Sequence, residues 1–143
     1  MQIEVITGRA QLGLLRLPWC VDLETRTEPI RISDERHRIG EALSIRIRDV
    51  ADDAVRVALS RQAAWGGRTL QKIQAIVARA EAAGRPPEIQ DSMGFRVGSE
   101  IVLMESCHRT CALYVLDPRQ FELRILVVDG GWDAYFDDRL AVS

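Results

Sequence analysis

The clearest hydrophobic pattern in the chain runs from Asp49 to Gly84. Two adjacent glycines at 66–67 interrupt it, and each costs roughly 1 kcal/mol in a helix interior. The pattern therefore predicts two helices, about 50–64 and 69–83, with Asp49 as the N-cap of the first and Gly84 as the left-handed cap of the second. The apolar positions that carry this prediction recur at helical spacing: Val55, Ala58, Leu59 and Ala63, then Leu70, Ile73, Ile76, Val77 and Ala80.

Shorter apolar or alternating runs on both sides of these helices predict strands. Before the helices we expect strands or strand-like runs at 2–7, 12–17, 19–23, 26–32 and 43–47. After the helices we expect a loop at 91–94, and then strands at 101–104, 111–116 and 121–128 joined by short turns, the first turn being a loop at 106–110. Three strands connected in this way make an antiparallel meander.

Strands followed by helices and then strands are typical of the α+β class. We therefore expect a single α+β domain covering 1–143, with a mainly antiparallel sheet and the two central helices packed on one of its faces. A chain of 143 residues is long enough for one hydrophobic core without staples.

Composition narrows the function classes. The net charge is −2 and no apolar run approaches the ~20 residues of a membrane span, so neither bulk nucleic-acid binding nor membrane insertion is indicated. The first residues lack the pattern of a signal peptide, and three cysteines argue against a secreted disulfide framework, so a cytoplasmic protein is expected. No motif indicates a cofactor.

Charge is uneven, and the acidic end gives the leading hypothesis. Residues 100–143 hold four arginines and eight acidic residues. Aromatic and acidic side chains gather near the end of this segment, where the aromatic ones offer contact area and the carboxylates would attract a basic surface. We therefore expect a small protein that binds another protein, of the inhibitor, immunity or anti-defence type, with a homodimer left open. The predicted partner-binding residues are Trp132, Asp133, Tyr135, Asp137 and Asp138.

Two alternatives remain open. Cys107 beside His108 suggests a small cysteine-dependent hydrolase or transferase, with His108 or His37 as the base, although neighbours in a chain seldom face each other. Adding Cys111 still leaves too few close ligands for a zinc site, so no metal is expected. The arginines between Arg31 and Arg48 suggest nucleic-acid binding, but acidic residues lie among them and no nucleic-acid-binding motif is present.

Overall fold

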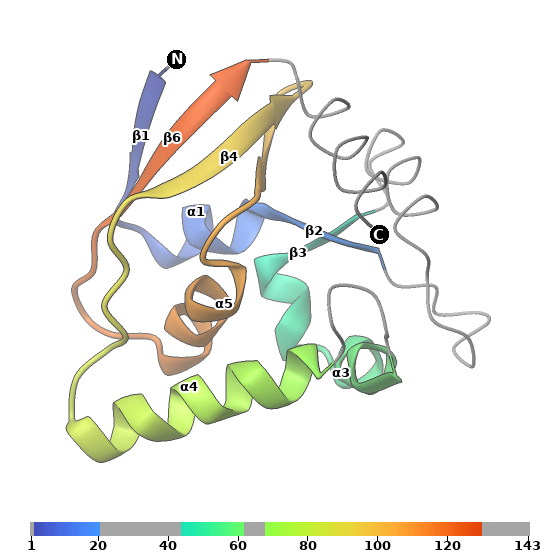
Figure 1. Ribbon diagram of the computed structural model, residues 1–143, viewed down its shortest axis with the longest axis vertical. Helices are drawn as coiled ribbons and strands as arrows, with labels where there is room; N and C mark the ends of the chain where they lie inside the picture. The colour runs from blue at the N-terminus through green and yellow to red at the C-terminus, as the bar shows by residue number, and fades with distance from the viewer. Residues whose placement is uncertain (1, 21–43, 62–67, 130–143) are drawn as a thin grey trace, which may run out of the picture.

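The computed structural model describes residues 2–20, 44–61 and 68–129 (Figure 1). Along the chain these residues form strands, four α-helices and one short 3-10 helix. In order, the elements are β1 (Gln2–Ile6), α1 (Arg9–Leu14), β2 (Arg16–Cys20), β3 (Ser44–Arg46), η1 (Ile47–Ala51), α3 (Asp53–Arg61), α4 (Thr69–Ala83), β4 (Ser92–Val97), β5 (Glu100–Leu103), α5 (Cys107–Leu116) and β6 (Leu123–Asp129).

The six strands form one sheet in the order β1-β6-β4-β5-β2-β3. The α+β class is confirmed, but the sheet is mixed rather than mainly antiparallel. The pairs β1–β6, β4–β5 and β2–β3 are antiparallel, whereas β4–β6 and β2–β5 are parallel. The physical reason is the connection after β5: a helix, α5, carries the chain across, so β6 returns on the far side of β4 and parallel to it.

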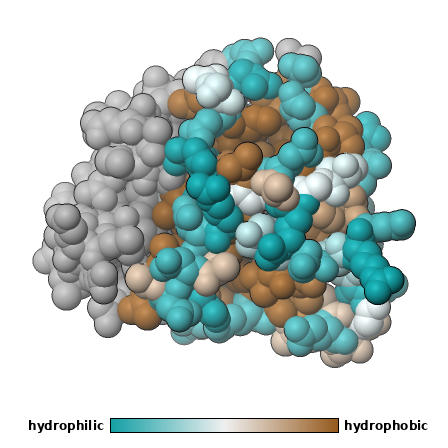
Figure 2. Space-filling view, turned by 180° about the vertical axis from the view of Figure 1, so that it is seen from behind, coloured by the Kyte–Doolittle hydropathy of each residue, from teal (hydrophilic) through white to brown (hydrophobic). Residues whose placement is uncertain are grey.

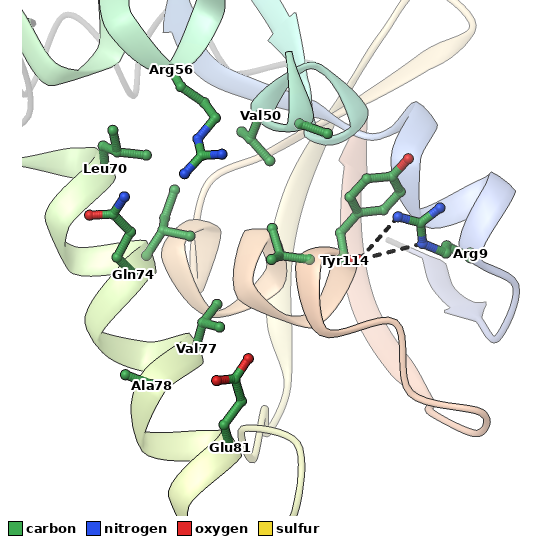
Figure 3. Close-up of a pocket in the computed structure, with 12 residues that line it drawn as sticks. Arg9, Val50, Arg56, Leu70, Gln74, Val77, Ala78, Glu81 and Tyr114 are labelled. Atoms are coloured by element: carbon green, nitrogen blue, oxygen red, sulfur yellow. Dashed lines mark hydrogen bonds between the residues drawn. The ribbon is translucent and has the colours of Figure 1, made fainter. Parts of the chain in front are cut away.

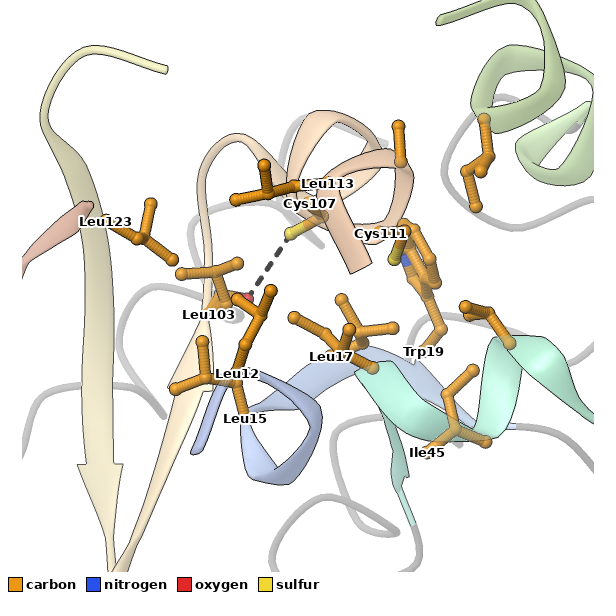
Figure 4. Packing of buried hydrophobic residues seen from close by; sticks show 14 of the residues in the cluster. Leu12, Leu15, Leu17, Trp19, Ile45, Leu103, Cys107, Cys111, Leu113 and Leu123 are labelled. Carbon is orange, nitrogen blue, oxygen red and sulfur yellow. Dashed lines mark hydrogen bonds between the residues drawn. The ribbon is translucent and has the colours of Figure 1, made fainter. Parts of the chain in front are cut away.

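The helices form two layers, which corrects the expectation of two central helices packed directly on the sheet. In Figure 1, α5 lies between the sheet and α4, and α4 packs against α5 and α3. The apolar side of the sheet supplies Ile6, Leu123, Ile125 and Val127 to the main core. Figure 4 shows how α1, β2, β5 and α5 close that core with Leu12, Leu17, Trp19, Leu103 and Leu113.

The predicted helix at 50–64 is divided in two. Residues Ile47–Ala51 form the 3-10 helix η1, and Asp52, in an extended conformation, separates it from α3. Asp52 caps α3, because its Oδ1 accepts hydrogen bonds from the backbone N–H groups of Ala54 (2.9 Å) and Val55 (3.2 Å). The predicted N-cap, Asp49, instead accepts from the N–H of Arg46 (2.8 Å) at the start of η1.

The second predicted helix is confirmed at both ends. Helix α4 spans Thr69–Ala83 and stops at Gly84, whose φ of +70° lies in the left-handed region that glycine adopts without steric cost. The backbone N–H of Gly84 donates to the carbonyl of Glu81, and that of Arg85 donates to Ala80. The Gly66–Gly67 pair and the end of the first predicted helix lie outside the described residues.

Two predicted strands are wrong. The segment 106–116 was expected as a loop and a return strand, but Cys107–Leu116 is helix α5. Its buried residues include Cys107, Thr110 and Cys111, a helical spacing that begins four residues before the apolar run at 111–116. The run at 12–17 is likewise divided between α1 and β2.

Four of the predicted strands are confirmed, and one hairpin was missed. Strands β1, β3, β5 and β6 occupy the expected positions, whereas β4 begins at Ser92 in the segment expected to be a loop. Val97 pairs with Glu100, so Gly98 and Ser99 form a two-residue turn, and the φ of +64° at Gly98 suits such a turn. The predicted runs beyond Cys20 and up to 43 lie outside the described residues. No helix among the described residues is long and apolar enough to cross a membrane.

Candidate functional site

A groove between the two helical layers, lined by described residues, is a candidate site (Figure 3). It encloses about 450 Å³, which falls within the usual range of about 300–1,000 Å³ for ligand pockets. Helix α4 forms one wall, η1 and α3 form a second, and α5 with the start of α1 forms the third. The lining side chains are Arg9, Val50, Ala51, Arg56, Leu70, Ile73, Gln74, Val77, Ala78, Glu81, Tyr114 and Val115.

One face of α4 supplies half of this lining. The contributing residues follow one another at steps of one and three positions, which keeps them on the same side of the helix. Three of the positions that predicted the helix from sequence, Leu70, Ile73 and Val77, therefore also line the groove. The residues are Leu70, Ile73, Gln74, Val77, Ala78 and Glu81. Ile73 is buried in the core, whereas Gln74 and Ala78 are exposed, so the face changes from core to open groove across the helix.

The wall at α5 is held in place by Arg9. Its guanidinium carbon lies 4.0 Å from the centre of the Tyr114 ring, close enough for a cation–π interaction. The same guanidinium donates to the backbone carbonyl of Tyr114 (3.4 Å) and pairs with Asp117 (3.3 Å). Beside this wall Val115 is 46% exposed, which leaves an apolar side chain open to the groove.

Opposite charges stand at two ends of the groove. In Figure 3 the guanidinium of Arg56 points into it from α3, and the carboxylate of Glu81 points into it from the far end of α4. Neither side chain forms an ion pair with the parts of the chain that are described. The groove therefore combines an apolar floor with one cation and one anion that are open to a ligand.

The cysteine and histidine of the catalytic alternative do not line this groove. Cys107 is 8% exposed and its Sγ donates to the carbonyl of Leu103 (3.5 Å), as the dashed line in Figure 4 shows. Cys111 is fully buried, and burial, followed by the neighbouring Cys107, raises the pKa of its thiol well above the ordinary value. A raised pKa keeps the thiol protonated and a poor nucleophile at neutral pH.

His108 is partly buried and packs beside a core residue, Trp19. Its ring lies 5.1 Å from that of Trp19, at an angle of 46°, and its Nε2 is buried without a hydrogen-bond partner among the described residues. Burial, followed by the positive charge of Lys72, lowers the pKa of His108 below its ordinary value. The ring is therefore neutral at physiological pH and packs as an aromatic side chain.

Of the predicted arginine cluster, the structure describes Arg46, which is ion-paired, and Arg48, which is exposed. Arg46 on β3 and Arg16 on β2 both bind the carboxylate of Glu100 on β5. Burial would raise the pKa of Glu100, but the hydrogen bonds and charges of Arg16 and then Arg46 outweigh it and hold that pKa below its ordinary value of 4.5. Arg48 is exposed on η1, and Arg31, like His37, lies outside the described residues.

The predicted partner-binding residues Trp132, Asp133, Tyr135, Asp137 and Asp138 also lie outside the described residues. Across 2–20, 44–61 and 68–129, no three His, Cys, Asp or Glu side chains come together as a metal site. Sequence reasoning missed the groove itself. Its walls come from segments as far apart as Arg9 and Val115, and only the spacing along α4 was visible in the sequence.

The chain was compared with protein-family models, with curated proteins and with solved structures, and none of them matches it.

Proposed function

We propose that this protein acts by binding another protein, as an inhibitor, immunity or anti-defence factor would, and that the groove between α4 and α5 receives an apolar segment of the partner. The observation that supports this best is the groove's composition. Its apolar floor is flanked by Arg56 and Glu81, neither of which is ion-paired within the described part of the chain. This arrangement matches the apolar centre and polar rim of protein interfaces.

The charges define the partner segment. An acidic side chain of the partner would pair with Arg56 and a basic one with Glu81, while apolar side chains between them would contact Val77 and Val115. These charged contacts lie at the rim, so they set the orientation of the segment more than the affinity. Burial of the apolar side chains supplies most of the binding free energy.

The acidic and aromatic residues near the C-terminus are the second half of this proposal. Asp133, Asp137 and Asp138 would meet a basic surface of the same partner, with Trp132 and Tyr135 in its pockets. Reversing the charge of the three aspartates should weaken partner capture and flatten its dependence on salt. Unchanged capture would contradict this part of the proposal but would not bear on partner binding by the groove.

The catalytic alternative has weaker support. Cys107 is buried in the core, and the buried Nε2 of His108 has no hydrogen-bond partner among the described residues, so this nitrogen does not pair with the Cys107 thiol as a base would. The protein-binding proposal needs no such pair.

The test fills the groove without disturbing the core. Ala78 is exposed on α4 and lines the groove, so Ala78→Arg places a long side chain in it at little cost to helix stability. Ala75→Arg is the matched control, because Ala75 is exposed on the same helix and does not line the groove. Both variants add the same side chain and the same charge.

The measurement is affinity capture from a native lysate with the wild-type protein and the two variants, followed by identification of the captured proteins. We expect one protein to be captured by the wild type and by Ala75→Arg, and to be lost or reduced at least about tenfold with Ala78→Arg. A partner captured equally by all three proteins binds elsewhere, and the groove proposal would then be wrong.

A further inference from the structure

We propose that β1 is the pairing edge of a homodimer, in which a second copy of the chain adds its own β1 antiparallel to the first, about a two-fold axis at Ile3. This surface is separate from the groove, because no residue of β1 lines it. The proposal therefore goes beyond the proposed function.

The two edges of the sheet differ in character. Edge strands are commonly protected by proline, lysine, bulges or short length. At the β3 edge the strand has only three residues, and its pairing with β2 is irregular. By contrast, β1 pairs with β6 in unbroken register over all five residues, Gln2–Ile6, and contains neither proline nor lysine. Within the described part of the chain, the β1 edge is therefore the less protected of the two, and its one charged side chain, Glu4, is already bound by Arg96.

Strand β1 also exposes an apolar surface. Alternate residues of a strand face opposite sides of the sheet, and Ile6 faces the core, so Ile3 and Val5 face outward. Their exposed fractions are 55% and 50%. Ile3 pairs with the half-buried Leu126 of β6, which extends the apolar strip onto the next strand. In Figure 2, seen from behind, apolar atoms gather over the upper part of the molecule, where Figure 1 places these strands.

Symmetry limits how two β1 strands can pair. An antiparallel pair within one continuous sheet requires a two-fold axis normal to the sheet, so outward residues lie opposite outward residues. The axis can then pass between the two copies of Ile3, of Glu4 or of Val5. Each choice sets the neighbours of Glu4, the only charged side chain in β1.

Avoiding like charges, together with hydrogen bonding to the Glu4 carboxylate, selects the axis at Ile3. An axis at Glu4 places the two Glu4 carboxylates opposite each other, and an axis at Val5 places Glu4 opposite Ile6. With the axis at Ile3, each Glu4 lies opposite Gln2 of the second copy, whose side-chain amide donates to carboxylates. Arg96 already binds the same Glu4 (3.2 Å) from within its own chain, so the carboxylate is paired on both sides.

The first measurement is sedimentation equilibrium from about 1 µM to about 1 mM, because pairing of one short edge buries little area and gives a weak dimer. We expect the wild type to dimerise in this range and Ile3→Lys to weaken the association at least about tenfold. Val57→Lys is the control, since Val57 is 45% exposed on α3, far from β1 in sequence, and should not alter the association. A wild type that stays monomeric throughout, or equal effects of the two variants, would overturn the proposal.

The second measurement tests the register without relying on a destabilising charge. In a Cys20→Ser background, single Ile3→Cys and Val5→Cys variants are treated with a short bifunctional thiol reagent. An axis at Ile3 brings the two thiols of the Ile3→Cys variant opposite each other, so that variant should cross-link faster. Equal rates or faster linking through position 5 would overturn the register, and far-UV circular dichroism confirms that each variant is folded.

Discussion

Gly94 in β4 offers a sharp test of how closely the central strands pack. A Cβ atom added there would lie 2.9 Å from the backbone oxygen of Val102 and 3.0 Å from Cγ2 of Ile101, both on β5. The backbone oxygen belongs to the sheet and cannot move aside as the end of a flexible side chain would. In Gly94→Ala, overpacking of this kind costs about 1–3 kcal/mol, and the reduced freedom of the unfolded chain offsets about 0.4–1 kcal/mol.

The expected net loss is about 1–2 kcal/mol in the free energy of unfolding, or a fall of about 3–8 °C in Tm. Urea denaturation followed by far-UV circular dichroism measures it. Gly98 is the comparison, because its φ is +64° and a Cβ atom there meets nothing within 4 Å. Asn tolerates positive φ, so Asn should be better than Ala at position 98 and worse than Ala at position 94. A Gly94→Ala variant as stable as the wild type would refute the close approach of β4 and β5.

Three further predictions concern the cap, the charge cluster and the buried thiols. Asp52→Ala removes the acceptor for two N–H groups of α3 and should lower the free energy of unfolding, measured by urea denaturation, by about 1 kcal/mol. A loss below about 0.3 kcal/mol would contradict the capping role of Asp52. Because the pKa of Glu100 is lowered in the folded protein, the stability that its carboxylate contributes is present above pH 4.5 and is lost as the pH falls through the folded pKa. Glu100→Gln should therefore be less stable than the wild type near pH 7, and this difference should shrink on acidification. A difference in stability that does not depend on pH would argue against the Arg16–Glu100–Arg46 cluster. In Cys20→Ser, the thiols of Cys107 and Cys111 should react with an aromatic disulfide reagent many times more slowly in buffer than in denaturant, and equal rates would show that the core around α5 opens readily.

Local signals in the sequence were sufficient for several elements. The helix at 69–83 was predicted with both ends correct, because its apolar spacing is regular and Gly84 followed by prolines stops it within a few residues. Alternation of apolar and polar residues was sufficient for β1 and β3. Each of these signals acts between residues that are close in the chain, so the sequence alone carries it.

Two further elements were within reach of sequence reasoning. The helical spacing of Cys107, Thr110 and Cys111 distinguishes α5 from a strand once it is read from Ser106 onward rather than from the apolar run alone. Gly98 and Ser99 between two short apolar segments are a two-residue hairpin signal that identifies β4 and β5. Short apolar runs fit helix and strand equally well, and this ambiguity produced the error at α5, whereas β4 was missed because its first residues were interpreted as a loop.

The tertiary structure alone decided the mixed sheet and the groove. Strand direction in a sheet depends on how α5 crosses between β5 and β6, and that path depends on the packing of Leu103, Leu113 and Leu123 in one core. The groove joins side chains from Arg9 to Val115, whose proximity no local pattern encodes. The same holds for Cys107 and His108, which are adjacent in sequence: the Sγ of Cys107 donates to Leu103 in the core, and the ring of the partly buried His108 packs beside Trp19. Sequence patterns determine local conformation through neighbouring residues, whereas sites are built from contacts between distant ones, which only the folded chain brings together.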